Sequence, residues 1–167
     1  MRVYLALGSN LGDRRGYLES AVYSLSRHGV EVRRSASVYL TEPHFLPNQP
    51  WFLNTVLEAS TSLNPEQLLE ACLNVEEEHF RTRTNIKESR TLDIDILFYG
   101  DMILRRSGLI IPHPSFASRR FVLEPLAEIA PDFIDPISGK SVRELLRDAG
   151  DSTEVRYFGP PLLQELT

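Results

Sequence analysis

Two aspartates one residue apart carry the clearest chemical signal in this sequence. Asp93 and Asp95 lie in a segment, 92–99, whose other residues are mostly apolar, which predicts a strand with one buried face. Because alternate side chains of a strand point to one side, both carboxylates would project together, and a cation or a shared proton would relieve their repulsion. Such oxygen ligands suit Mg²⁺, whose other ligands come from water and substrate phosphates. The alternative is a solvated strand edge. The opposite, buried face would carry Leu92, Ile94, Ile96 and Phe98.

Three arginines stand just before this strand. Arg81, Arg83 and Arg90 lie in a segment from about residue 79 to 91, which we expect to be a loop that can fold over the carboxylates. Carboxylates that hold metal, next to guanidinium groups that reach phosphate oxygens, are components of phosphoryl transfer. The alternative is an ordinary charged surface loop. The chain has only two lysines among its 18 basic residues, a bias that fits phosphate binding but equally fits a GC-rich genome.

A second group of residues could bind a flat ligand. Phe52 and Asn54 share one face of an expected strand, 52–59, and offer an aromatic plane beside an amide that both donates and accepts hydrogen bonds. The pair suits a flat heterocycle, or equally a core aromatic residue beside a capped Asn. His113 stands between two prolines, and we interpret it as a phosphate donor, a metal ligand or a structural residue.

The nucleotide-binding loops with the best-known motifs are missing from the sequence. Residues 8–13, Gly-Ser-Asn-Leu-Gly-Asp, would connect a strand to a helix, but no Gly-Lys-Ser or Gly-Lys-Thr follows them, which excludes a Walker loop. Gly-x-Gly-x-x-Gly does not occur, which argues against a dinucleotide site.

The pattern of apolar residues predicts the elements that must position these groups. We expect strands at residues 3–7, 30–40, 52–59 and 92–99, the second as one long strand with a buried face. A first helix would be ended by Gly29, and a second would begin with Asn64 as its cap, Pro65 in its first turn and Gln67 three residues after the cap. Further helices are expected at 121–129 and 141–149. This order predicts an α+β fold, a ferredoxin-like β-α-β-β-α-β sheet with helices on one face and C-terminal additions.

Composition restricts the class of protein. The 167 residues, 25% charged and 42% hydrophobic, fit one compact domain spanning residues 1–167. A net charge of −5 argues against broad nucleic-acid affinity, and the single cysteine, Cys72, excludes an intramolecular disulfide. No stretch of the chain approaches the roughly 20 apolar residues of a membrane span. The apolar run at the N-terminus is also too short for the core of a signal peptide. We therefore expect a cytoplasmic protein with neither nucleic acid nor membrane as a partner.

Five ordered segments resemble the 6-hydroxymethyl-7,8-dihydropterin pyrophosphokinase family of folate biosynthesis. The resemblance implies a ferredoxin-like monomer that moves a diphosphoryl group from ATP to the hydroxymethyl oxygen of the pterin and leaves AMP. It also implies two Mg²⁺ ions, brought with ATP, as cofactors. The segments are LALGSNLG at 5–12, QPWFLN at 49–54, RTLDIDIL at 90–97, IPHP at 111–114 and RRFVLEPL at 119–126.

The resemblance also implies roles for single positions. Asp93 and Asp95 match the family's metal pair, and Arg81 and Arg90 match loop arginines that act on the transferring group. The positions that match the nucleotide site are Glu76, Arg83, Ile96, His113 and Arg119. Those that match the pterin site are Thr41, Phe52, Asn54 and Phe121, with the pterin stacked between the two phenylalanine rings.

The chain departs from the family pattern in several places. Residues 87–89, Lys-Glu-Ser, stand where many members carry Trp-Gly-Pro. Leu73 and Gly108 stand where some members have a polar nucleotide contact and an arginine, so those two contacts are not carried over. Glu42 replaces a proline seen in some members.

Two other classes of protein use the same kinds of residue. A non-catalytic ligand-sensing module would bind a pterin without Mg²⁺ or nucleotide. A metal-dependent nuclease or nucleotidyltransferase would use the same aspartates, although the acidic net charge and the set of Phe52, Asn54 and Phe121 disfavour a polymeric substrate.

Overall fold

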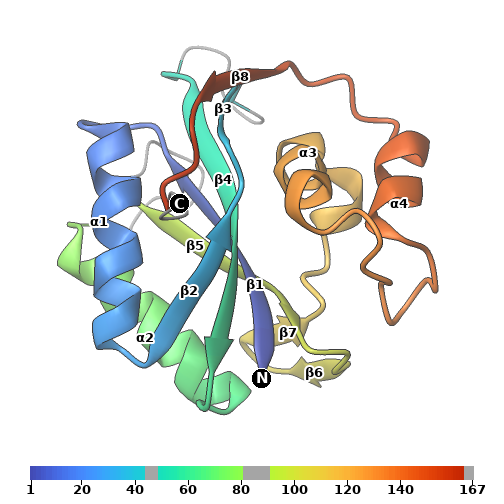
Figure 1. The fold of residues 1–167 in the computed structure, drawn as a ribbon, viewed down its shortest axis with the longest axis horizontal. Helices are drawn as coiled ribbons and strands as arrows, with labels where there is room; N and C mark the ends of the chain where they lie inside the picture. The colour runs from blue at the N-terminus through green and yellow to red at the C-terminus, as the bar shows by residue number, and fades with distance from the viewer. Residues whose placement is uncertain (44–48, 81–90, 164–167) are drawn as a thin grey trace.

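A computed structural model describes residues 1–43, 49–80 and 91–163. In this part of the chain helices flank both sides of an antiparallel sheet, α1 and α2 on one side and α3 and α4 on the other (Figure 1). The elements in chain order are β1 (Arg2–Ser9), α1 (Arg14–Arg27), β2 (Val30–Ser35), β3 (Val38–Thr41), β4 (Phe52–Thr61), α2 (Pro65–Glu78), β5 (Asp93–Tyr99), β6 (Leu104–Arg106), β7 (Leu109–Ile111), the 3-10 turn η1 (Phe116–Ser118), α3 (Arg120–Ile129), α4 (Val142–Asp148) and β8 (Val155–Gly159).

The main sheet places the chemically interesting strands next to one another. Its order is β5-β1-β4-β3-β8, with β2 also paired to β4, and all of these pairs are antiparallel. Gly8 of β1 aligns with Asn54 of β4 on one side and with Asp93 of β5 on the other. β1 therefore separates the strand of the amide from the strand of the two aspartates. A separate hairpin is formed by β6 and β7.

The segment 30–40 is two strands, and the prediction of one long strand was wrong. β2 pairs with the second half of β4, whereas β3 pairs with its first three residues. At the break, the Ala36 N–H donates to the carbonyl of Val56 at 2.9 Å, and the Thr55 hydroxyl lies 3.0 Å from the carbonyl oxygens of both Ala36 and Ser37. This side-chain contact replaces part of the regular ladder, which the apolar alternation of the segment does not reveal.

Both faces of the sheet are covered: α1 and α2, the two helices of the expected β-α-β-β-α-β unit, lie on one face as predicted, and α3 and α4 cover the other (Figure 1). Leu5 and its β1 neighbours of the same parity pack against buried leucines of α1 and α2, such as Leu18 and Leu68. Tyr4, which points the other way, belongs to a second core with Val56 of β4 and Leu123 of α3. The sheet thus divides two hydrophobic clusters, and α3 closes the side onto which the even-numbered residues of β1 project.

A bulge in β5 changes which face its residues use. Tyr4 pairs with Phe98 but the next residue, Leu5, pairs with Ile96, so Leu97 is an extra residue in the ladder. Phe98 therefore joins the second cluster with Leu97, whereas Ile96 belongs to the first. The prediction that Phe98 shares a face with Ile96 was wrong for this reason.

Local signals located most helices correctly. α2 begins at Pro65 behind a complete capping box of Asn64 and Gln67, and Gly29 follows α1 with a φ of +85°, a conformation that glycine adopts readily. α3 and α4 lie where they were expected. The sequence analysis missed the β6–β7 hairpin and β8, because strands of three to five residues are too short for a clear alternation.

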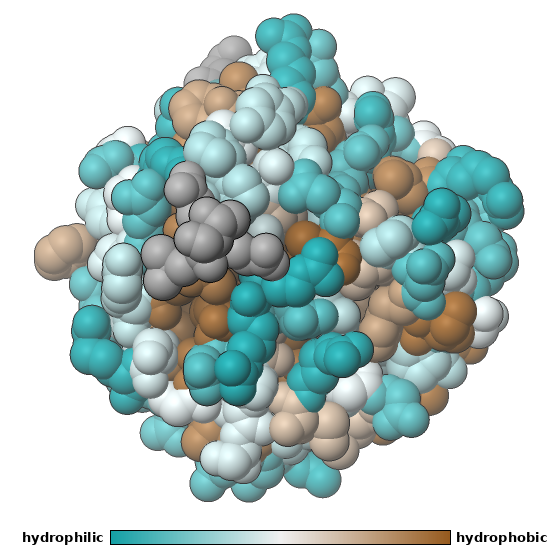
Figure 2. All heavy atoms as spheres, viewed as in Figure 1, coloured by the Kyte–Doolittle hydropathy of each residue, from teal (hydrophilic) through white to brown (hydrophobic). Residues whose placement is uncertain are grey.

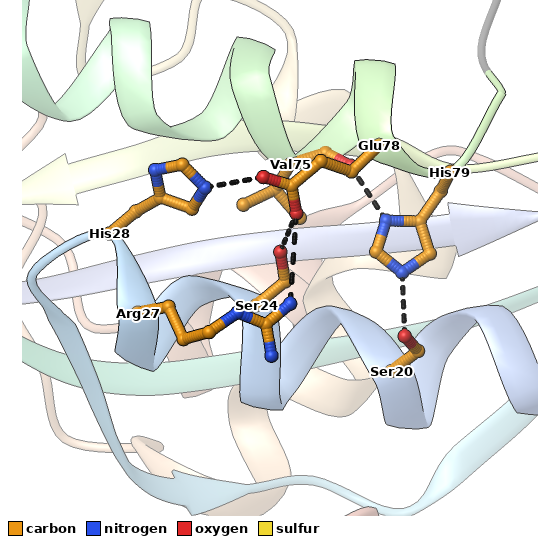
Figure 3. Close-up of polar contacts among 7 residues, drawn as sticks. All are labelled: Ser20, Ser24, Arg27, His28, Val75, Glu78 and His79. Carbon is orange, nitrogen blue, oxygen red and sulfur yellow. Dashed lines mark hydrogen bonds and ion pairs between the residues drawn. The ribbon is translucent and has the colours of Figure 1, made fainter.

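Polar contacts join α1 to the end of α2 (Figure 3). The Ser24 hydroxyl donates to the Glu78 carboxylate, and Nε2 of His28 lies 2.6 Å from the other oxygen of that carboxylate. Next along the chain, Nε2 of His79 lies 2.9 Å from Oγ of Ser20. These contacts fix the last turn of α2, directly before the segment that contains the predicted arginines.

Hydrophilic residues cover much of the face shown in Figure 2, with apolar patches between them. Of the helices in the described residues, none combines the length and the apolar character needed to cross a membrane.

Candidate functional site

The two aspartates project from the start of β5 on the side of the sheet that α3 covers. Ile94, between them, is buried in the first cluster, so the carboxylates point toward the second. Both are partly exposed, and the side chain of Asp95 is 38% accessible. The sheet thus holds two carboxylates together at a surface where ligands can reach them, as the sequence predicted.

Asn54 lies on the same side, one strand away. Gly8 faces both Asn54 and Asp93 across the β4–β1–β5 ladders, and directly paired residues of antiparallel strands project to one side. Glycine is required here because a Cβ at position 8 would lie 2.5 Å from Oδ1 of Asn54. The missing side chain leaves room between the amide and the carboxylates.

The amide of Asn54 has a fixed orientation. Its Nδ2 donates a hydrogen bond of 2.6 Å to Oγ1 of Thr41, and both residues are buried. Oδ1 is consequently the end of the amide nearest Gly8. Phe52, two residues earlier on β4, is half-buried on the same side. The structure therefore brings together three of the residues predicted for a flat heterocycle.

His113 lies beside Asp95 in a neutral form. Its Nδ1 accepts a hydrogen bond from the Ser115 N–H at 3.1 Å, so the ring proton is on Nε2, which lies 4.0 Å from Oδ2 of Asp95. Burial, and then the positive charge of Arg119, lowers the pKa of His113 to about 4, although Asp93 acts in the opposite direction. A neutral ring with its proton on Nε2 can donate a hydrogen bond to an anionic oxygen.

A cavity of about 250 Å³ opens next to these groups along the edge of β5. Asp95, Ile96 and His113 line it, which brings together one predicted metal ligand and two predicted nucleotide residues. The remaining lining residues are Leu69, Ile94, Gly108, Leu109, Ile110 and Pro114. The sequence analysis missed the wall formed by the β6–β7 hairpin, which the Ser-Gly pair at 107–108 could have indicated as a turn.

Comparison with known proteins places this chain in a family. Residues 4–131 match the family model described as 7,8-dihydro-6-hydroxymethylpterin-pyrophosphokinase (HPPK). The chain belongs to this family. All of the predicted site residues fall inside the matched range.

Several HPPK relatives align with most of the chain. A 2-amino-4-hydroxy-6-hydroxymethyldihydropteridine pyrophosphokinase of Synechocystis sp. is 41% identical over 159 residues, which are 95% of this chain and 80% of the relative. The protein of that name from Bacillus subtilis is 46% identical over 127 residues, 75% of this chain and 76% of the relative. The folic acid synthesis protein fol1 of Pneumocystis carinii is 41% identical over 140 residues, 84% of this chain but only 19% of that longer protein.

Solved structures share the HPPK fold of this chain. The crystal structure of Plasmodium falciparum HPPK-DHPS with SDX-DHP superposes with a TM-score of 0.63 at 15% identity, over 87% of this chain and 43% of that chain. At this identity the likeness concerns the fold: a mixed structure of helices and an antiparallel sheet. The chain spans less than half of that protein.

Two residues that we predicted for the candidate site flank the start of α3. Arg119 immediately precedes the helix, and its guanidinium carbon lies 5.7 Å from the ring centroid of Phe121. Phe121 is partly buried against the second cluster, on the side of the sheet where Asn54 and the aspartates project. α3 thus brings a cation and an aromatic ring to that side.

Glu76 has a structural contact in this HPPK chain. It lies on α2, only 2% exposed, and its carboxylate accepts the backbone N–H of Ile94 at 2.7 Å. Glu76 thus binds the β5 backbone at Ile94, the residue between the two aspartates, from the side of the sheet opposite to their carboxylates. The nucleotide contact that we predicted for Glu76 stays a prediction. Arg81, Arg83 and Arg90 lie outside the described residues, and so do their predicted contacts.

Proposed function

We propose that this protein transfers a diphosphoryl group from ATP to the hydroxymethyl oxygen of 6-hydroxymethyl-7,8-dihydropterin, giving AMP and the pterin diphosphate. The observation that carries the proposal is the row Asn54–Gly8–Asp93, which sets an oriented amide and a carboxylate pair on one side of the sheet. Membership of the HPPK family supports it.

In this proposal the pterin occupies the side of the sheet next to Asn54. The amide, fixed by Thr41, reads the polar edge of the ring, and Phe52 and Phe121 stack on its two faces. Since a single rotamer of Asn54 is held by a buried hydrogen bond, little ordering is left to occur on binding.

ATP would lie along the edge of β5. Ile96 and His113 line the cavity there, and Arg119 precedes α3 nearby, so an aromatic base would fill the cavity while its phosphates reach the cations. Nε2–H of the neutral His113 ring donates to a phosphate oxygen. By sequence, Glu76 and Arg83 complete the nucleotide set, and Arg81 and Arg90 stabilise the charge of the transferring group.

Asp93 and Asp95 fit two Mg²⁺ ions that arrive with ATP. They are hard, partly exposed oxygen donors on one strand, and the described residues hold no group of three or more His, Cys, Asp or Glu side chains that could bind a metal. Water and phosphate oxygens would thus complete the coordination, as Mg²⁺ prefers. When bound, such ions neutralise charge on the phosphate oxygens.

The reaction needs positioning more than it needs a reactive side chain. The pterin hydroxyl attacks the β-phosphorus of ATP in line with the departing AMP, and no covalent enzyme intermediate is formed. The residues of this chain bind both substrates, orient the hydroxyl and stabilise negative charge as it moves toward AMP.

The test is to identify the nucleotide formed from ATP, Mg²⁺ and the pterin alcohol. We expect AMP; ADP would mean an ordinary single-phosphate kinase, and pterin binding without Mg²⁺ or nucleotide dependence would mean a sensing module. Asp95→Asn should lower kcat by about 100-fold or more, because a metal ligand is lost. The matched control Asp101→Asn, in the exposed turn after β5, should keep wild-type turnover.

The proposal extends to the fold and the assembly. The order β1-α1-β2/β3-β4-α2-β5 supports a ferredoxin-like classification, with α3, α4 and β8 as additions. We also propose that the protein is a single domain and a cytoplasmic monomer. Light scattering should then give a mass near 19.0 kDa that does not rise with protein concentration.

A further inference from the structure

A short segment near the C-terminus, residues 151–154, connects two parts of the fold that are far apart in sequence. We call it the bridging segment. It follows α4 and leads directly into β8, which lies beside β3 in the sheet (Figure 1). It lies beyond residue 131, where the match to the family model ends.

One end of the bridging segment holds the start of α3. Oδ2 of Asp151 accepts the backbone N–H of Arg120, the first residue of the helix, at 2.9 Å. Oδ1 of the same carboxylate accepts the Thr153 N–H at 2.9 Å, and the Thr153 carbonyl accepts from Nη1 of Arg120 at 3.4 Å. Among the described residues, the side chain of Arg119 makes no capping bond, so Asp151 supplies from a distance the acceptor that this helix start requires.

The other end of the bridging segment holds the end of β3. Oε1 of Glu42 accepts the Glu154 N–H at 2.7 Å, and the Glu42 N–H donates back to the Glu154 carbonyl at 3.3 Å. Glu42 directly follows Thr41, whose hydroxyl orients the amide of Asn54. The first residue after the segment, Val155 of β8, pairs with Thr41 in the β3–β8 ladder.

The two anchored points are next to residues of the candidate pterin site. Phe121 follows Arg120 at one end, and Thr41 precedes Glu42 at the other. The contacts of the segment therefore join two elements of the proposed pterin site. One is α3, which holds Phe121, and the other is β3, whose Thr41 orients the amide of Asn54.

Glu128 of α3 also accepts hydrogen bonds from Ser37 and Tyr39 at the beginning of β3. Loss of either anchor would therefore loosen only the start of α3 relative to the end of β3, without removing any group that touches the ligand.

We propose that Asp151 and Glu42 are positioning residues for pterin binding, acting through the bridging segment on Phe121 and Thr41. The inference rests on the proposed function. No residue of the segment or of its anchors lines the cavity along β5, so the segment acts mainly on the pterin side of the site. Arg119, a predicted nucleotide residue, precedes the anchored Arg120, so Glu42, at the other anchor, gives the sharper test.

The experiment compares KM for the pterin with KM for ATP in single variants. Asp151→Ala and Glu42→Ala should each raise the pterin KM by about fivefold or more, the effect of one lost hydrogen bond on binding geometry, and leave the ATP KM within about twofold. Glu42→Gln keeps an oxygen acceptor for the Glu154 N–H and should restore most of the affinity. Asp151→Asn keeps only one of the two oxygens that accept from Arg120 and Thr153 and should restore part of it. Asp132→Ala, at an exposed ion pair with Arg143 in the same part of the chain, is the control and should change neither constant.

The outcomes separate this inference from the proposed function. Failure of the wild-type protein to form AMP overturns the proposed function. An active wild-type protein whose alanine variants keep the pterin KM, or raise both KM values equally, overturns the role of the bridging segment alone. If Asp151→Ala does not fold by circular dichroism, Glu42→Ala, which breaks only the β3 end, decides the question.

Discussion

At the scale of single residues, Gly8 shows how one missing side chain shapes the site. Gly8 lies on β1, between Asn54 on β4 and Asp93 on β5. Because it has no side chain, only backbone atoms lie between these two residues on this face of the sheet. The amide cannot simply move away from a larger residue, because its Nδ2 is held by Thr41 in a buried hydrogen bond.

We predict that Gly8→Ala impairs pterin binding more than folding. A Cβ at this position would approach Oδ1 of Asn54 to 2.5 Å, so the amide must turn and lose its bond to Thr41. The pterin KM should rise about tenfold, and the melting temperature should fall by only a few degrees. Steady-state kinetics and thermal unfolding measure both. Gly150→Ala, where no atom lies within 4 Å of an added Cβ, should leave both values unchanged.

At the scale of elements, the contact between α1 and α2 depends on a charged carboxylate (Figure 3). The hydrogen bond from Ser24, and then the contact with His28, lowers the pKa of Glu78 below its usual value of 4.5. A carboxyl whose pKa is lower in the folded protein than in the unfolded chain stabilises the fold above the unfolded pKa. That contribution is lost as the pH falls through the folded pKa.

Glu78→Gln should therefore lower the melting temperature near neutral pH and have little effect in acid. The difference between wild type and variant should shrink as the pH falls below about 4.5, because the wild-type carboxyl is then protonated as well. Thermal unfolding from neutral to acidic pH measures this. Glu77→Gln, at the exposed neighbouring position on α2, is the matched control; an equal change there, or a difference independent of pH, would contradict the explanation.

At the scale of the whole molecule, two hydrophobic clusters share one sheet. The second cluster holds α3 over the side of the sheet where the candidate site lies, and Phe98 stands near its centre. Its ring packs 4.6 Å from that of Phe133, 4.9 Å from that of Phe116 and 6.2 Å from that of Tyr4, measured between centroids.

Phe98→Ala should destabilise the protein by about 3–5 kcal/mol, because it removes a 1% exposed ring and leaves a cavity. Urea unfolding followed by circular dichroism measures the free energy. Tyr157→Ala removes an aromatic side chain that is 66% exposed and should cost less than about 0.5 kcal/mol. A similar loss for both variants would show that the second cluster does not stabilise the fold.

The sequence by itself determined the local structure and the chemical groups. A short apolar run located β1, apolar alternation located β4 and β5, and the capping box at Asn64 located the start of α2, because these signals depend on neighbouring residues alone. The same alternation placed Asp93 and Asp95 on one side of their strand. The roles of these residues stay predictions from the family resemblance.

The tertiary structure decided which of these groups meet. The row Asn54–Gly8–Asp93 depends on the register of two ladders, and the apolar pattern of each strand is compatible with several registers. The bulge at Leu97, the hairpin wall of the cavity and the hold of Asp151 on α3 arise from contacts between distant segments. Such contacts form because packing and hydrogen bonding over the whole chain favour them, so no local run of residues encodes them.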